Sequence, residues 1–262
     1  MNILDQINAN TKKEVAERKT QVTVSSLEKQ AYFQRNELPS LRKHLLDPSK
    51  SGIIAEIKKK SPSKGIINDS ISVEDVGEAY QVAGASAISV LTDFTYFGGK
   101  MEYLKAVRER VSIPILRKDF MVDEYQVLEA KAIGADIILL IAASLTPKEI
   151  KNLAQLAKSI GLEVLMEVHN QEELDRSLNE YLDVVGVNNR NLKTFDVSTQ
   201  TSLDLLDNIP NDFLKISESG LKDAATINEL KQAGYQGFLI GETFMKTNNP
   251  GKALSELISE IQ

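Results

Sequence analysis

Five charged residues stand at the ends of apolar segments that otherwise look like buried strands: Glu56, Lys58, Lys118, Glu167 and Glu218. A carboxylate or an ammonium group is costly in such a place unless it is paired or used in chemistry. These groups are also the side chains that exchange protons with a substrate. The set therefore favours an acid/base site, and a purely structural ion-pair network is the alternative.

The charged residues fall on consistent sides of their segments. Side chains alternate along a strand, so Glu56 and Lys58 share one side with Ile54. The same spacing places an apolar residue before each of the other charges: Leu116 before Lys118, Leu165 before Glu167, and Ile216 before Glu218. If the strands are parallel, three carboxylates and two ammonium groups converge on one end of the sheet.

A recurring unit of helix, glycine and short apolar run organises the chain. Glycine lies just past four helical patterns, where it adopts the left-handed conformation at low cost: Gly84, Gly134, Gly161 and Gly234. The spacings are close to multiples of about 25 residues, enough for a helix, a strand and two short loops. The unit predicts eight strands, at 53–58, 87–91, 113–118, 136–141, 162–167, 183–188, 213–218 and 236–240. Helical patterns follow them at 73–83, 100–110, 124–133, 147–160, 171–179, 199–208, 223–233 and 250–261.

Helix starts agree with this division. Thr146 and Glu149 form a capping box with Pro147 at the first helical position. Ser72 with Asp75, Asp123 with Gln126, and Asn249 before Pro250 are weaker start signals.

Eight strand–helix units predict a (β/α)8 TIM barrel that forms a single domain over residues 1–262. An open doubly wound sheet is the competing fold, but no G-x-G-x-x-G follows the first strand. Residues 1–50 precede the first strand and predict one or two helices that cover one end of the barrel, with Ser25 and Glu28 as a capping box. A partly ordered arm is the alternative.

The mouth of such a barrel, at the carboxyl ends of its strands, is where active sites lie. The loops "SESGL" and "IGETF" follow the last two strands, and this pair often binds phosphate, so Gly220 and Gly241 predict an anion site. Lys60 and Ser61 can reach that anion from across the mouth. Phe97 and Phe120 can stack on a substrate ring or only pack a loop onto the barrel. We expect His169 at the surface, just beyond Glu167.

Composition excludes several classes of function. The net charge of −6 argues against nucleic-acid binding as the main task. The absence of cysteine excludes disulfides and thiolate chemistry, and the presence of only two histidines argues against a multi-histidine metal site. The amino terminus lacks an apolar core of signal-peptide length, and no stretch is long enough to span a bilayer. We therefore expect a cytoplasmic protein that binds no membrane.

Seven segments together resemble the indole-3-glycerol phosphate synthase family, in order through all eight strands: "IIAEIKKKSPSKG", "VLTDFTYFGG", "PILRKDFMVDEYQVLEAKAIGADIILLI", "LMEVHNQEEL", "VGVNNRNLKTF", "ISESGL" and "FLIGETFM". The resemblance implies a (β/α)8 barrel with an N-terminal extension, residues 1–50, over the mouth. It implies ring closure of 1-(2-carboxyphenylamino)-1-deoxyribulose 5-phosphate with loss of CO2 and water. It also implies a small phosphorylated substrate, with no metal, organic cofactor or obligate protein partner.

The resemblance also implies roles. Lys118 matches the family's acid, Lys58 a second lysine that holds the substrate carboxylate, Glu167 the carboxylate of the second step, and Glu56 its partner. Asn188, Glu218 and Ser219 match the remaining residues of the catalytic group. The implied substrate- and phosphate-binding residues are Lys60, Ser61, Phe97, Phe120, Arg190, Gly220, Leu239, Gly241 and Glu242. Some family members carry serine where this chain has Glu242, so we expect only its backbone N–H to meet the phosphate.

Three alternatives remain open at this point. Phosphoribosylanthranilate isomerase, another phosphate-binding barrel, relies on a cysteine base that this chain lacks. A Schiff-base aldolase would use Lys118 as its nucleophile. A non-catalytic barrel would bind a phosphorylated ligand or a partner, although every expected mouth charge is present.

Overall fold

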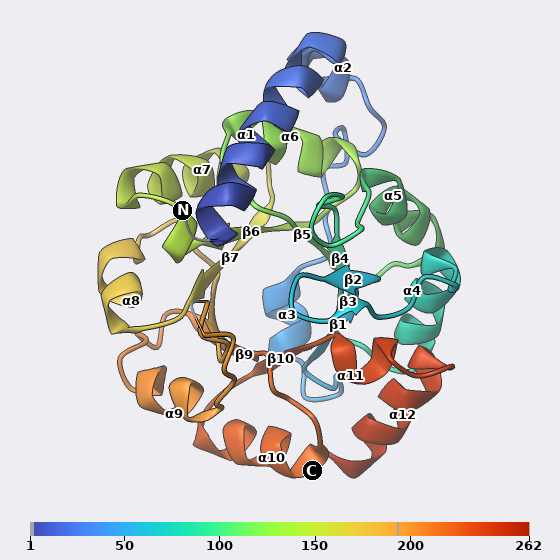
Figure 1. The fold of residues 1–262 in the computed structure, drawn as a ribbon, viewed down its shortest axis with the longest axis vertical. Coiled ribbons are helices and arrows are strands. Elements are labelled where there is room, and N and C mark those ends of the chain that lie inside the picture. The colour runs from blue at the N-terminus through green and yellow to red at the C-terminus, as the bar shows by residue number, and fades with distance from the viewer. Residues whose placement is uncertain (1–2, 193, 262) are drawn as a thin grey trace.

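The computed structural model describes residues 3–192 and 194–261 and has a closed barrel of parallel strands at its centre (Figure 1). Each strand pairs with the next one along the chain, and the last pairs with the first. The barrel strands are β1 (Ile53–Ile57), β4 (Ala87–Leu91), β5 (Ile115–Lys118), β6 (Ile137–Ile141), β7 (Glu163–Val168), β8 (Val184–Asn188), β9 (Leu214–Glu218) and β10 (Gly237–Ile240). The predicted (β/α)8 barrel is confirmed.

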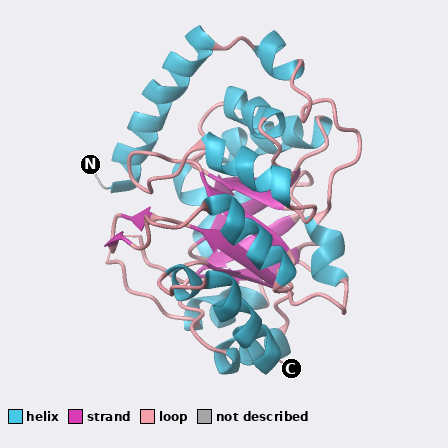
Figure 2. Ribbon diagram, turned by 90° about the vertical axis from the view of Figure 1, so that its right-hand side faces the viewer, coloured by secondary structure: helices cyan, strands magenta, loops and turns pink. Residues whose placement is uncertain are grey.

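An outer ring of helices surrounds the strands (Figures 1 and 2). Its members are α4 (Val73–Val82), α5 (Met101–Arg110), α6 (Glu124–Ala132), α7 (Pro147–Ser159), α8 (Gln171–Ser177), α9 (Gln200–Leu206), α10 (Ala224–Ala233) and α12 (Pro250–Glu260). Strands and ring helices begin and end within two residues of the predicted positions. Three short elements were not predicted: the hairpin of β2 (Lys60–Ser61) and β3 (Gly65–Ile66), the 3-10 turn η1 (Ala142–Ser144), and α11 (Glu242–Met245).

Local signals explain why the helices begin and end where they do. Thr146 and Glu149 form the predicted capping box at the start of α7, and the Ser72 side chain accepts a hydrogen bond from the Asp75 N–H. Asp123 and Asn249 also cap their helices. The four glycines that follow helical patterns all have positive φ, as a left-handed C-terminal residue requires.

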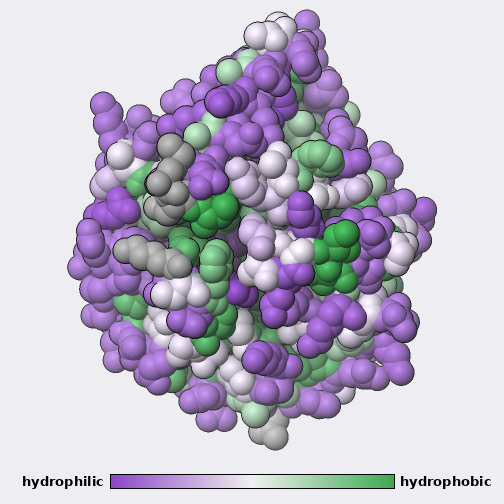
Figure 3. Space-filling view, viewed as in Figure 1, coloured by the Kyte–Doolittle hydropathy of each residue, from purple (hydrophilic) through white to green (hydrophobic). Residues whose placement is uncertain are grey.

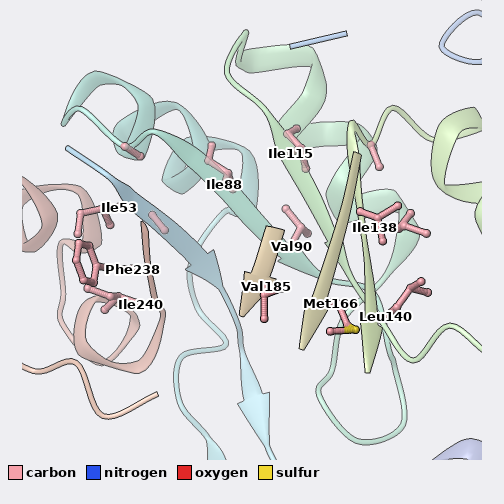
Figure 4. Close-up of a cluster of buried hydrophobic side chains, with 14 of the residues drawn as sticks. Ile53, Ile88, Val90, Ile115, Ile138, Leu140, Met166, Val185, Phe238 and Ile240 are labelled. Carbon is pink, nitrogen blue, oxygen red and sulfur yellow. The ribbon is translucent and has the colours of Figure 1, made fainter. Parts of the chain in front are cut away.

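The barrel strands are mostly apolar because both of their faces are buried. One face contributes to a cluster inside the barrel that includes Ile54, Leu116 and Leu165. The other face packs against the ring helices; Figure 4 shows part of that cluster, with Ile88 and Val90 among its labelled side chains. Because successive side chains of a strand point alternately into the barrel and toward the helices, every second residue lies inside the barrel. This alternation determines which charged residues at the strand ends point inward.

The N-terminal extension is divided between the two ends of the barrel. Helix α1 (Ile3–Gln21) lies beside α6, α2 (Val24–Glu28) follows it, and Ile3, Leu4 and Ile7 line the cavity at the mouth (Figure 1). Helix α3 (Leu41–Leu46) lies at the opposite end, where Leu41 and Leu45 pack into the interior cluster. Within residues 3–50, the extension thus has three helices rather than one or two.

One local expectation for the extension was wrong, the capping box at Ser25 and Glu28. The cap of α2 is Thr23, whose side chain accepts from the Ser26 N–H, and not Ser25 with Glu28. Thr23 occupies the N-cap position because the helix begins at Val24, so Ser25 lies inside the first turn. At the far end, the Glu163 carboxylate accepts hydrogen bonds from the Ser40 hydroxyl and from the Leu41 and Arg42 N–H groups, which anchors α3 to the start of β7.

A buried ion-pair network ties α1 to β5. Arg18 of α1 pairs with both oxygens of Glu129 at 2.8 and 3.1 Å. Arg117, whose side chain is 1% exposed, lies 3.5 Å from Glu129 and 2.9 Å from Asp119. Because side chains alternate, Arg117 and Asp119 point outward while Lys118 between them points into the barrel. Glu129 therefore serves two arginines at once.

Among the described residues, no helix combines the length and the apolar character that crossing a membrane requires.

Replacing Glu129 by Gln should lower the free energy of unfolding by about 3 kcal/mol, because Arg18 and Arg117 keep their charges and lose the carboxylate between them. Urea denaturation monitored by circular dichroism measures the change. Glu124→Gln, an exposed position on the same helix, is the matched control and should stay within about 0.5 kcal/mol of the parent. Equal stability of the two variants would show that the network contributes nothing.

Candidate active site

The charged strand ends converge at the mouth as predicted, with Lys118 at their centre. Its ammonium nitrogen lies 2.7 Å from Oε2 of Glu167 and 2.7 Å from Oε2 of Glu218. The three side chains are 13%, 6% and 2% exposed, so the contacts are nearly dry. Glu56 accepts a hydrogen bond from Lys58 on the same side of β1. Four strands thus contribute side chains to one cluster of charged residues at the mouth.

The protonation states follow from charge acting against burial. Burial lowers the pKa of Lys118, but Glu167, Glu218 and Glu56 outweigh burial and raise that pKa overall. Burial likewise opposes ionisation of Glu167, yet Lys118 and His169 prevail and lower its pKa. Burial raises the pKa of Glu218 to about 7, with Glu167 and Glu56 adding to the effect and Lys118 opposing it. The surroundings therefore favour ionisation of Glu167 and disfavour ionisation of Glu218.

Two glycines make room for these carboxylates. A Cβ atom at Gly186 would lie 2.4 Å from Oε1 of Glu218, and one at Gly241 would lie 2.5 Å from Oε1 of Glu56. Any side chain larger than hydrogen at either position would therefore clash with a carboxylate oxygen. The glycine in "VVGVN" is therefore required by the carboxylate on the neighbouring strand rather than by the conformation of its own backbone.

A cavity of about 570 Å³ opens above the charged group. Figure 3 shows this end of the molecule, with apolar surface beside a hollow near the middle of the view. The cavity brings together nearly all the predicted residues: Glu56, Lys58, Ser61, Phe97, Lys118, Phe120, Glu167, Asn188, Arg190, Glu218, Ser219, Gly220, Leu239, Gly241 and Glu242. Lys60 is the exception, since its ammonium group donates to the Thr95 carbonyl oxygen 3.3 Å away.

The loops after β9 and β10 form one side of the cavity. Ser219 and Gly220 both have positive φ, at 68° and 78°, a strained choice for serine that recurs at functional sites. Gly241 directly precedes α11. Glu242 is paired with Lys64 of the β2–β3 hairpin at 3.7 Å, and its side chain is 40% exposed. An anion entering here meets backbone and a carboxylate that already has a cation beside it.

The remaining predicted side chains lie around the cavity wall. The Phe97 and Phe120 rings contact each other, with centroids 6.0 Å apart. Oδ1 of Asn188 accepts from the Arg190 N–H at 3.0 Å, which fixes the turn that presents both residues.

His169 is not at the surface, and that expectation was wrong. Its side chain is 7% exposed and lies between two carboxylates, with Nε2 3.3 Å from Glu167 and Nδ1 3.0 Å from Glu173. The signal was available, because His169 stands two residues after Glu167 and four before Glu173. It was missed because the strand was expected to end at 167, whereas β7 continues to Val168.

Other residues of the cavity were not among the predicted site residues, although Ile3, Leu4 and Ile7 fall on one face of the predicted N-terminal helix. Ile3, Leu4 and Ile7 come from α1, far from β1 in sequence. Lys64, Lys222 and Lys246 add cations to the loops after β1, β9 and β10. Single lysines in polar loops resemble solvated surface, and only the folded barrel gathers them.

Comparisons with known proteins agree on one family. A family model described as indole-3-glycerol phosphate synthase matches residues 4–257. Relatives named indole-3-glycerol phosphate synthase include one from Bacteroides thetaiotaomicron, 45% identical over 99% of each chain. Another, from Polynucleobacter necessarius subsp. necessarius, is 43% identical over 98% of this chain and 99% of its own.

Solved structures with low identity support the fold alone. A 3-hexulose-6-phosphate synthase aligns with a TM-score of 0.63 at 14% identity, over 80% of this chain and 100% of its own. A tryptophan synthase alpha chain from Legionella pneumophila subsp. pneumophila gives 0.62 at 12% identity, over 86% and 96%.

Replacing Lys118 by Met should make stability fall as pH rises. Without the ammonium group, burial together with the charges of Glu167 and Glu56 raises the pKa of Glu218 further above that of the unfolded chain, because Lys118 no longer opposes them. A raised carboxyl pKa gives stability that is present at low pH and lost as the pH rises through the folded value. The loss relative to the parent should grow by about 1–3 kcal/mol between pH 5 and pH 8 in urea denaturation. Lys60→Met, outside the cavity, is the control, and equal pH dependence in all three proteins would contradict this.

Proposed function

The chain belongs to the indole-3-glycerol phosphate synthase family, and we propose that the residues at its barrel mouth perform the family's reaction in the roles given below. The enzyme is a carboxy-lyase of tryptophan biosynthesis. It closes the pyrrole ring of 1-(2-carboxyphenylamino)-1-deoxyribulose 5-phosphate, losing CO2 and water, to give indole-3-glycerol phosphate. The observation that carries the roles is the Lys118 ammonium group held between Glu167 and Glu218 at the cavity.

The cavity suggests how the substrate lies. Its phosphate sits against the loops after β9 and β10, at Ser219, Gly220, Gly241 and the backbone N–H of Glu242. Ser61 contacts the phosphate from the opposite side. The aromatic ring packs near the Phe97–Phe120 pair, with Leu239 as part of the apolar wall. The sugar chain then spans the cavity above Lys118.

Ring closure is an attack by a ring carbon on the substrate ketone. That carbon is a poor nucleophile, so the carbonyl oxygen must be polarised and then protonated. Lys118 donates this proton, because the alkoxide that forms is a strong base and accepts it even from an ammonium group with a raised pKa. Lys58 and Arg190 hold the substrate carboxylate until it leaves as CO2.

Dehydration completes the indole ring. The lowered pKa of Glu167 keeps this carboxylate ionised and ready to accept a proton from the intermediate. The departing hydroxyl group takes a proton from a lysine, and both Lys58 and Lys118 line the cavity. Glu56 holds Lys58, while Asn188 and Glu218 orient the substrate hydroxyls and the lysines.

The proposal extends to organisation and setting. Residues 1–262 act as one barrel domain whose N-terminal extension, residues 1–50, contributes the start of α1 to the mouth. The enzyme acts in the cytoplasm on a small phosphorylated substrate and needs no obligate protein partner, as the family's biosynthetic role suggests. Neither nucleic acid nor membrane is a partner.

Indole fluorescence after addition of the carboxyphenylamino-deoxyribulose phosphate tests the roles directly, because the chain contains no tryptophan. Lys118→Ala should lose about 1000-fold or more in kcat, and Glu167→Gln about 100-fold, since each removes a proton-transfer group. Lys105→Ala, an exposed lysine of α5, is the control and should keep the parent rate. Equal rates in all four proteins would keep the activity and refute the assigned roles.

A further inference from the structure

His169 is a buried imidazole that the reaction described above does not use. Its Nδ1 atom lies 3.0 Å from Oε2 of Glu173, and its backbone N–H donates to the same oxygen at 2.9 Å. Its Nε2 atom lies 3.3 Å from Oε1 of Glu167, on the side of that carboxylate away from Lys118. The ring therefore connects the proposed base of the second step to a carboxylate on α8.

The local structure explains why the ring is held so firmly. Only His169 and Asn170 separate β7 from α8, so the strand passes directly into the helix. Asn170 caps α8 by accepting from the Glu173 N–H, and its amide donates back to Oε1 of Glu173 at 3.0 Å. The second oxygen of Glu173 remains for His169. The residues that start the helix thus also fix the orientation of the imidazole.

Among the described residues, the charged groups in contact with the ring are two carboxylates. Glu167 from its own strand and Glu173 from α8 face it, and Lys118 reaches the far oxygen of Glu167 from β5. Burial lowers the pKa of His169, but its contacts with the two carboxylates, Glu167 and Glu173, outweigh burial and raise that pKa to about 9. An imidazolium ion carries hydrogen on both ring nitrogens, so Nδ1 donates to Glu173 while Nε2 faces Oε1 of Glu167 at 3.3 Å as an ion pair without hydrogen-bond geometry.

We propose that His169, oriented by Glu173, is a positioning residue that holds Glu167 ionised and turned toward the cavity. The proposal rests on the assigned role of Glu167 in dehydration. An imidazolium ion on one carboxylate oxygen and an ammonium ion on the other leave the carboxylate a single orientation. Without the imidazolium ion, Glu167 loses one of its two cationic neighbours and has freedom to rotate away from the substrate.

A simpler role for His169 is to strengthen the start of α8. That role predicts lower stability in variants, and it predicts no change in how catalysis depends on pH. The positioning role predicts a link between the protonation of one imidazole and kcat. Glu173 separates the two, because Glu173→Gln alters the charge beside His169 without touching Glu167.

The titration of His169 can be observed directly, since the chain has only two histidines. Protein labelled with ¹⁵N-histidine is titrated by long-range ¹H–¹⁵N NMR, and His169→Gln identifies the signals of His44. We expect His169 to titrate near pH 9 in the parent, and at least about one pH unit lower in Glu173→Gln. Glu172→Gln, an exposed neighbour on the same helix, should match the parent. A parent value near the ordinary 6.5 would overturn the proposal.

Kinetics supply the second readout. The parent kcat should fall as the pH rises through the titration of His169, and Glu173→Gln should shift this fall to lower pH by the same amount. His169→Ala should reduce kcat by about tenfold or more at neutral pH with little change in KM, because a displaced catalytic group loses rate rather than binding. His169→Gln, which restores a neutral donor, should recover part of the rate without the pH-dependent fall.

The outcomes distinguish this proposal from the assigned reaction. An active parent with an unperturbed His169, or a kcat profile that ignores Glu173→Gln, overturns the positioning role and leaves the reaction intact. A parent that turns over no substrate overturns the reaction itself, whatever the NMR titration shows, and the positioning role falls with it. Stability changes in His169→Ala with unchanged kcat would identify a helix cap and nothing more.

Discussion

One ammonium group held between two carboxylates, almost out of water, is the constraint that the rest of the structure serves. Each isolated charge would cost several kcal/mol to bury, so Lys118, Glu167 and Glu218 are stable only if their geometry is fixed. Parallel strands provide that geometry, because their carboxyl ends meet in a ring and every second side chain points inward. Gly186 and Gly241 provide the space, since a Cβ atom at either position would overlap a carboxylate oxygen.

The strand that carries Lys118 has charge on both of its faces. Toward the barrel interior, Lys118 meets the catalytic carboxylates, and toward the helices, Arg117 pairs with Asp119 across it. The outer pair joins the side chains of the residues directly before and after Lys118. Strand β7 shows a similar arrangement, because the residues that cap α8 also hold His169 beside Glu167. In both places a structural contact outside the barrel adjoins a charged group inside it.

Much of this could be predicted from the sequence because the signals are local. Apolar runs, glycines past helix ends and capping residues determine each βα unit, and alternation along a strand determines which charges share the mouth. What could not be predicted depends on distant parts of the chain. Lys60 lies on the hairpin formed by β2 and β3, which turns its ammonium group toward Thr95. Helix α3 reaches the far end of the barrel because Glu163 binds its start, a contact between residues more than 100 positions apart.

Helix α1 lies outside the ring of βα units, yet its Arg18 pairs with Glu129, a buried carboxylate of the ring helix α6. Cutting the chain before β1 would therefore not yield a smaller version of the same enzyme. It would leave Glu129 with one arginine fewer at the outer face of the strand that bears Lys118. A minimal barrel built from this sequence needs a substitute cation at that point, or a neutral side chain at 129 together with a new partner for Arg117. The N-terminal extension and the barrel thus share the Arg18–Glu129 ion pair. A redesign that separates the two segments has to replace this pair.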